Sequence, residues 1–220
     1  GGRQREMDGV NSMLGMGRSG RQTWFQSGLV VGAAGAVVQA LTIATACAHA
    51  EWSASSSRSA RLSEVVLIGE MVGAVTWSGI ADLAGRKESS VLACVVVAAA
   101  TAACGFASSF GVLCASCAAA GFGLSGCFVC PSLLVLERAP PWCRGRCTVG
   151  LAAMATVGAA VATCAHAAIE AAGARASWES SSTPRWRTLC AAMALFPFGA
   201  GLSASERLPE SLPWLVAKGR

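Results

Sequence analysis

Long apolar segments recur along this chain and alternate with short polar ones. Six of them occupy residues 24–48, 65–83, 91–107, 112–136, 148–172 and 188–203. A helix needs about 20 residues to cross the hydrocarbon core of a bilayer, and these segments lack the apolar–polar alternation of barrel strands. Because hydrocarbon offers no partner for backbone polar groups, each segment is predicted to be a helix. The pattern predicts an all-α fold, a multi-pass transmembrane bundle of six helices.

The segments differ in hydropathy and in the length of the loops that connect them. Only residues 108–111 separate the third from the fourth, which predicts a helical hairpin. The fifth is rich in Ala and only marginally apolar, so we expect it to pack inside the bundle and not against lipid. The chain opens at Gly1 and has its first methionine at Met7, which indicates a fragment of a longer protein.

The composition favours a membrane protein over a soluble domain. Hydrophobic residues make up 54% of the chain and charged residues 13%, whereas about a quarter of the residues in soluble domains are charged. The net charge is +5, and the basic residues lie in short clusters between the apolar segments. This pattern indicates that they set the membrane topology, and we expect no nucleic-acid partner. Most of the 11 Cys lie inside apolar segments, and the chain has only 2 His. We expect no metal and no cofactor, and interpret the cysteines as small packing residues.

The Lys and Arg residues set the predicted orientation. If the N-terminus is cytosolic, twelve of the 17 fall in cytosolic segments and five in outer ones. Basic residues gather on the cytosolic side of membrane proteins, so both termini are predicted to be cytosolic. A cleaved signal peptide is an alternative for the first segment, but that segment exceeds the usual apolar core of about 7 to 15 residues.

A glycine-rich segment that ends in charges joins the second and third apolar segments. It holds Gly69, Gly73, Gly79, Asp82, Gly85, Arg86 and Lys87. It resembles the signature loop of the major facilitator superfamily, written as Gly, several residues, Asp, a basic residue, any residue, Gly, Arg and a basic residue. Leu83 departs from that pattern, since the family usually carries Arg or Lys there. Glycine allows close helix approach, and Asp82 and Arg86 are expected to pair with each other or with nearby helix ends.

Two further segments strengthen the resemblance. After the fourth apolar segment come Glu137, Pro140, Arg144 and Gly145. After the sixth come Pro209, Glu210 and Ser211. These are similar to the inner loop and to the exit of the sixth helix in the sugar, organic-ion and synaptic-vesicle-protein branches, although Leu212 and Pro213 replace an expected Pro and Arg. The three motifs stand in the family's order over nearly the whole chain.

The resemblance implies a transporter whose two six-helix halves give a small solute alternating access across the bilayer. Residues 1–23 are then a cytosolic leader, residues 24–206 the N-terminal six-helix transmembrane half-domain, and residues 207–220 the start of the central cytosolic loop. The expected partners are the lipid bilayer, a small-molecule substrate and a C-terminal six-helix half. This half alone is not expected to transport, because a midplane cavity needs walls on both sides.

The charged loops have a functional and a structural interpretation. The resemblance implies that Asp82 and Arg86, with Lys87, form a latch that holds the inner gate closed; the alternative is a solvated turn that only sets topology. Glu137 and Arg144 are expected to pair across the loop after the fourth segment. A surface pair contributes only about 0 to 1 kcal/mol, so the value of this pair would be conformational.

Polar side chains inside the apolar segments form a second set of candidates. The candidate substrate or proton site comprises Gln39, Glu70, His166 and Glu170. His166 and Glu170 are four residues apart and share a helix face. Ionisable groups at membrane depth indicate proton coupling or a cationic substrate; the alternative is a hydrated pair near the outer headgroups.

Two other patterns have structural interpretations. Residues 121–126 match the dinucleotide pattern G-x-G-x-x-G, but that pattern needs a strand before it. Inside an apolar helix it indicates close helix packing. Trp77 and Trp142 lie near the cytosolic ends of their segments and are interpreted as interfacial anchors.

Transport of a small organic solute, either an organic ion or a sugar-like molecule, is the leading hypothesis. The alternative is a truncated, non-transporting membrane scaffold, or a half-transporter that acts only on dimerisation. An enzyme is disfavoured, because two His and scattered Ser provide no nucleophile, base and orienting group in a recognisable pattern. Six further spans in the native protein would favour the transporter, and a native six-span product would favour the alternative.

Overall fold

A computed structural model of the protein describes residues 18–51, 56–175, 185–211 and 214. The long helices are α2 (Arg18–Glu51), α3 (Ser56–Ala84), α4 (Arg86–Gly105), α5 (Phe110–Arg138), α6 (Arg144–Arg175) and α7 (Arg185–Arg207), and a 3-10 turn, η1 (Pro141–Cys143), precedes α6. All six contain a stretch long and apolar enough to cross a membrane. The predicted all-α bundle of six membrane-spanning helices is confirmed.

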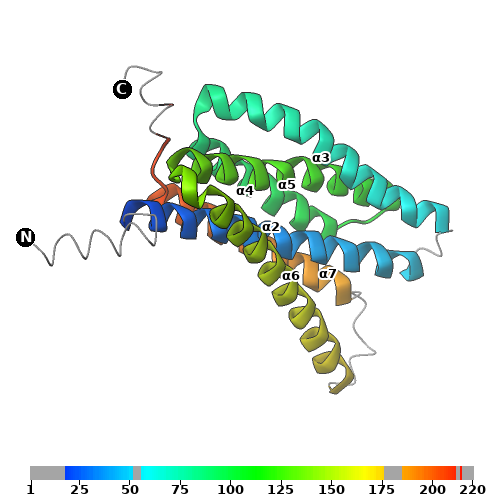
Figure 1. The fold of residues 1–220 in the computed structure, drawn as a ribbon. Helices are drawn as coiled ribbons and strands as arrows, with labels where there is room; N and C mark the ends of the chain where they lie inside the picture. The colour runs from blue at the N-terminus through cyan, green and yellow to red at the C-terminus, as the bar shows by residue number, and fades with distance from the viewer. Residues whose placement is uncertain (1–17, 52–55, 176–184, 212–213, 215–220) are drawn as a thin grey trace, which may run out of the picture.

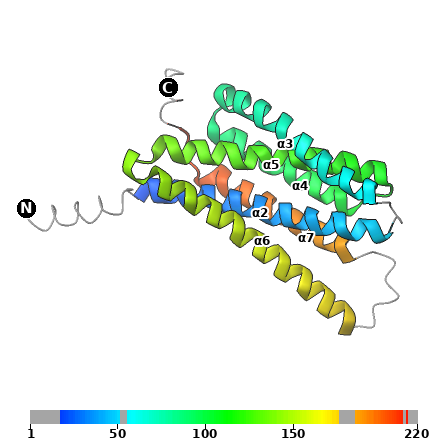
Figure 2. The same cartoon turned by 45° about the vertical axis from the view of Figure 1, so that its right-hand side comes forward.

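Four helices form the centre of the bundle, and two flank it. α2, α5, α4 and α7 pack in a closed ring, in which each contacts the next. α3 packs mainly on α5, and α6 mainly on α2, so α3 and α6 lie at opposite edges (Figures 1 and 2). Consecutive helices run antiparallel. The starts of α2, α4 and α6 and the ends of α3, α5 and α7 therefore meet at one end, called the inner end below.

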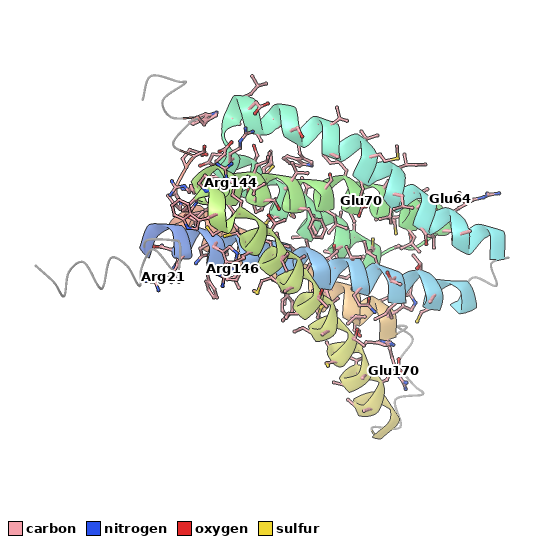
Figure 3. All side chains as sticks on the ribbon, viewed as in Figure 1. Arg21, Glu64, Glu70, Arg144, Arg146 and Glu170 are labelled. Carbon is pink, nitrogen blue, oxygen red and sulfur yellow. The ribbon has the colours of Figure 1, made fainter. Side chains whose placement is uncertain are left out.

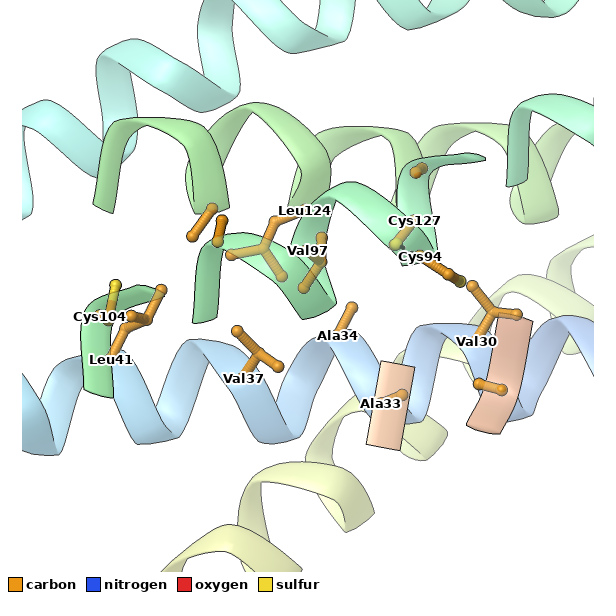
Figure 4. Packing of buried hydrophobic residues seen from close by; sticks show 14 of the residues in the cluster. Val30, Ala33, Ala34, Val37, Leu41, Cys94, Val97, Cys104, Leu124 and Cys127 are labelled. Carbon is orange, nitrogen blue, oxygen red and sulfur yellow. Dashed lines mark hydrogen bonds between the residues drawn. The ribbon is translucent and has the colours of Figure 1, made fainter. Parts of the chain in front are cut away.

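The buried core consists of small aliphatic side chains and cysteines (Figure 4). Leu124 of α5 and Val97 of α4 face Val37 of α2, and all three are fully buried. Eight of the eleven cysteines are buried as free thiols. The interpretation of the cysteines as packing residues is confirmed for these eight and is wrong for Cys164, which is exposed.

Glycines bring the backbones of two helix pairs into contact. A Cβ on Gly73 of α3 would overlap the Phe122 carbonyl of α5, and one on Gly121 of α5 would overlap the Val66 carbonyl of α3. Gly158 of α6 meets the Gly32 carbonyl of α2 in the same way. Only small residues allow such approach between membrane helices, so the α3–α5 and α2–α6 contacts depend on glycine. The interpretation of residues 121–126 as a packing surface is confirmed.

Hydroxyl side chains are accommodated in these helices by local hydrogen bonds. Several of them donate to the carbonyl four residues earlier, which removes the need for water. The donors include Thr42, Thr76, Ser78, Thr148, Thr156 and Thr163, at distances of 2.8–3.2 Å. The hydroxyl protons of these six side chains are therefore satisfied within their own helices.

Two expectations about packing are wrong. α6 was expected inside the bundle, but it is the least buried span, with 17% of its most apolar stretch buried. Its alanines suit one close contact with α2, and its contacts with α5 and α7 are much smaller. Trp77 was expected at the membrane interface, yet it is 1% exposed, and its indole donates to the Phe122 carbonyl at 2.8 Å. Trp142, 70% exposed at the inner end, has the position of an anchor.

Replacing Gly121 with Ala is expected to destabilise the protein by about 1 to 3 kcal/mol, because the new methyl group overlaps the α3 backbone. Gly79→Ala is the matched control: it lies on α3, and nothing is within 4 Å of its Cβ position. Thermal unfolding in detergent can be followed with a thiol-reactive dye, since unfolding exposes the buried cysteines. Equal melting temperatures for the two variants would contradict the close approach of α3 and α5.

Candidate functional site

Charged side chains from four parts of the chain meet at the inner end of the bundle. Together they form what is called the inner cluster below. Its members are Asp82 at the end of α3, Arg86 at the start of α4, Glu137 and Arg138 at the end of α5, and Glu210 and Ser211 after α7. The sequence motifs that were far apart in the chain are thus one structure.

Arg86 is the centre of the inner cluster. Its guanidinium pairs with the Asp82 carboxylate at 2.5 Å and with the Glu137 carboxylate at 3.3 Å. The two acids differ in exposure: the Asp82 side chain is 68% exposed, and the Glu137 side chain only 23%. Water screens the first pair, whereas the second would leave a partly buried charge uncompensated if either partner were removed. The expected pairing of Asp82 with Arg86 is confirmed.

Glu210 caps α4 from the far end of the chain. One of its carboxylate oxygens accepts the backbone N–H groups of Arg86 at 2.9 Å, Lys87 at 3.2 Å and Ser211 at 3.0 Å. The first N–H groups of a helix have no partner within it, and a negative charge there also interacts favourably with the helix dipole. The Ser211 hydroxyl donates to Glu137. The segment after α7 is thereby held against the ends of α4 and α5.

Gly85 is the single residue between α3 and α4, and the cluster needs a glycine there for two reasons. Its φ is +106°, in the region that side chains disfavour. A Cβ would also lie 2.7 Å from the Glu210 carboxylate. By contrast, nothing lies within 4 Å of a Cβ on Gly79 or Gly145, so close approach does not explain those two glycines of the motifs.

The expected pair between Glu137 and Arg144 is wrong. Glu137 is held by Arg86 and Ser211, while the guanidinium of Arg144 donates to the Ala139 carbonyl at 3.2 Å. Arg144 therefore closes the end of α5 and the turn through Pro140, without joining the inner cluster. Basic residues do gather at this end of the bundle, where Figure 3 shows Arg21, Arg144 and Arg146.

The outer-end candidates do not form one site. Glu170 pairs with Arg185 of α7 at 2.6 Å, and both side chains are about 40% exposed or more. His166 is half-buried, and its Nδ1 has no hydrogen-bond partner among the described residues. Gln39 is half-buried on α2. The Glu170 pair thus stabilises the α6–α7 end, and nothing joins it to His166 or Gln39.

Two cavities lie along α2. One, of about 260 Å³, is between α2 and α3 and contains Glu70. The other, of about 500 Å³, is between α2, α6 and α7 and is lined almost wholly by apolar side chains, with Ser203 at its edge. Gln39 and His166 line neither of them.

Sequence reasoning missed two members of this architecture. Arg138 donates to the Glu210 carbonyl at 2.5 Å, and the indole of Trp214 donates to the Asp82 carbonyl at 3.1 Å. Both contacts join residues more than 70 positions apart. No local sequence pattern predicts these two contacts. A basic residue in the last turn of α5 is, however, a usual feature of helix ends.

Six helices long and apolar enough to cross a membrane, closed at one end by a charged cluster, define a multi-pass membrane protein. The family model described as "Sugar (and other) transporter" matches residues 20–220. The chain belongs to this family, within the major facilitator superfamily. The resemblance inferred from the three motifs is confirmed.

Individual relatives agree with this assignment. The chain is 29% identical over 171 residues to the niacin transporter NiaP of Acinetobacter baylyi, covering 77% of the chain and 36% of that protein. It is 30% identical over 156 residues to human solute carrier family 22 member 11, covering 71% of the chain and 26% of that protein. The matched segment is therefore 36% of the length of the first relative and 26% of the length of the second.

Solved structures share the fold. The inward-open xylose transporter XylE from E. coli aligns with a TM-score of 0.68 at 19% identity, over 90% of this chain and 49% of that one. A bacterial homolog of the human lysosomal transporter Spinster, inward-facing and unoccupied, aligns with a TM-score of 0.73 at 14% identity, over 90% of this chain and 44% of that one. The six helices correspond to one half of such transporters.

Replacing Glu210 with Ala is expected to destabilise the protein by about 1 to 2 kcal/mol, because α4 loses the acceptor for its first N–H groups. Glu206→Ala is the control, since that side chain is exposed in the last turn of α7 and has no partner among the described residues. The thermal unfolding midpoint in detergent measures both. If the two midpoints fell equally, Glu210 would not act as the cap of α4.

Proposed function

We propose that the chain forms the N-terminal half of a transporter that moves a small organic solute, an organic ion or a sugar-like molecule, by alternating access. A second six-helix half supplies the other wall of the solute pathway. The inner cluster is the observation that supports this proposal most directly. In this proposal, residues 24–206 are the transmembrane half-domain, residues 1–23 a cytosolic leader, and residues 207–220 the start of the loop to the second half.

The inner cluster has the properties of a conformational latch. It fixes the inner ends of three helices to one another through Arg86, Glu137 and Glu210, so this half moves as one body. Asp82 differs from these, because its carboxylate is mostly exposed. It is therefore accessible to a donor on the second half when the inner side closes, and released when that side opens. A contact made in one state and not in the other biases the equilibrium between them.

The two flanking helices support the need for a second half. Met71 and Val75 of α3 and Val149 of α6 are each at least 70% exposed. Such apolar faces suit either lipid or a partner helix. In a two-half transporter one of these surfaces meets the second half, which would account for a span as poorly buried as α6. The scaffold alternative is not favoured, because the family and the curated relatives are transporters.

In the native-length protein, Asp82→Asn is expected to reduce the transport rate at least about fivefold at normal surface abundance. The estimate corresponds to a coupling of 1 kcal/mol or more between the latch and the open state. Glu88→Gln is the control, since this exposed carboxylate lies in the first turn of α4 and makes no ion pair among the described residues. Uptake of a radiolabelled solute, normalised to surface protein, measures the effect. An unchanged rate in the Asp82 variant would refute the latch.

Both termini are proposed to be cytosolic, which places the inner end inside the cell. Cysteine introduced at Trp142, exposed near the inner end, is then expected to react with a membrane-impermeant maleimide only after permeabilisation. Cysteine introduced at Ser108, exposed in the α4–α5 joint, is expected to react in intact cells. The reverse pattern of labelling would invert the topology.

A further inference from the structure

The cavity of about 260 Å³ between α2 and α3 is lined by side chains of both helices. On α2 the lining residues are Val38, Leu41, Thr42 and Thr45; on α3 they are Ser63, Val66, Leu67 and Glu70; Leu124 of α5 closes the base. Both sets follow the i, i+3, i+4, i+7 spacing of a single helix face. The cavity is thus the space between two facing stripes.

Glu70 is the one ionisable group in this lining, and it lies deep in the membrane. It stands ten residues from Ala60 and fourteen from Ala84, the ends of its span, or about 15 Å and 21 Å along the helix axis. It has no ion pair or hydrogen bond within the part of the chain that the structure describes. Figure 3 shows Glu70 midway along α3, with Glu64 toward the outer end. A carboxylate at this depth is costly and marks a functional position.

The polar groups around Glu70 accept hydrogen bonds more readily than they donate them. The Thr42 hydroxyl already donates to the Val38 carbonyl at 2.9 Å, and the Thr45 hydroxyl donates to the Thr42 carbonyl at 2.9 Å. The oxygens of Thr42 and Thr45 can therefore accept hydrogen bonds from a ligand in the cavity but cannot donate one. Among the lining hydroxyls, that of Ser63 alone has no hydrogen-bond partner among the described residues. No basic side chain lines the cavity. A lining with one carboxylate and spare acceptors favours a cation over an anion.

The remaining lining is aliphatic, and this limits the kind of cation. Ca²⁺ takes six to eight oxygen ligands, and the lining side chains supply five, two from Glu70 and one each from Thr42, Thr45 and Ser63. An organic ammonium group needs one counter-charge and apolar contact for its alkyl groups. We propose that the α2–α3 cavity is a binding site for a small organic cation, with Glu70 as its counter-ion. The proposal rests on the proposed transport function, and it names the charge of the solute.

The test is equilibrium binding to the purified native-length protein. The probes are choline and its uncharged isostere, 3,3-dimethylbutan-1-ol, titrated by calorimetry. The wild type is expected to bind choline at least about tenfold more tightly than the alcohol, and Glu70→Gln is expected to weaken choline binding by about ten- to a hundredfold, because the variant lacks the counter-charge of the ammonium group. The variant's affinity for the alcohol should not change.

Two further variants separate charge from folding. Glu64→Gln removes an exposed carboxylate from the same helix and should leave choline binding unchanged. Glu70→Asp keeps the charge and should retain most of the binding, so a loss in Glu70→Gln cannot be assigned to misfolding. Equal wild-type affinity for choline and the alcohol, or choline binding unaffected by Glu70→Gln, would overturn the site. If choline bound through Glu70 but was not taken up, only the proposed transport function would be overturned. If choline was taken up but its binding did not depend on Glu70, only this inference would be overturned.

Discussion

Helices in a bilayer gain little from the hydrophobic effect when they meet, because lipid tails are as apolar as their side chains. Association comes instead from interhelical hydrogen bonds and from dispersion contacts, which require backbones to approach closely. In this chain Gly73 and Gly121 make that approach between α3 and α5, and Gly158 makes it between α6 and α2. The outer helices of the bundle touch little else. Their positions, and every polar group that they carry, therefore depend on these few glycines.

Packing also determines which side chains face one another. A helix turns by about 100° per residue, so the contact of Gly73 with α5 fixes the rotation of α3 about its own axis. With that rotation, the neighbouring face of α3, which contains Glu70, is directed toward α2. The same contact sets the end of α3, where Asp82 meets Arg86 across Gly85. The ionisable groups of α3 are thus placed by the contact between α3 and α5. Changes in that contact would reach both the cavity and the inner cluster.

Much of the fold could be predicted from the sequence, because span length and hydropathy are local properties. The six helices, the close-packing glycines of residues 121–126 and the Asp82–Arg86 pair, four residues apart, all follow from local spacing. The ion-pair partner of Glu137 could not be predicted in this way. Arg86 lies 51 positions earlier in the chain, and local spacing favoured the nearer cation, Arg144. Trp77 and the exposure of α6 were missed for a related reason: burial depends on which helices become neighbours, and composition does not specify that.

The contact between Glu210 and the start of α4 also constrains the order of assembly. Arg86 leaves the ribosome long before Glu210, which lies 124 positions later in the chain. During synthesis the first turn of α4 must keep its N–H groups solvated at the membrane surface until α7 has been inserted. Completion of α7 then replaces that water with a carboxylate. The residues made after α7 are therefore the ones that close this bundle, and a chain interrupted before them would leave the first turn of α4 without its carboxylate.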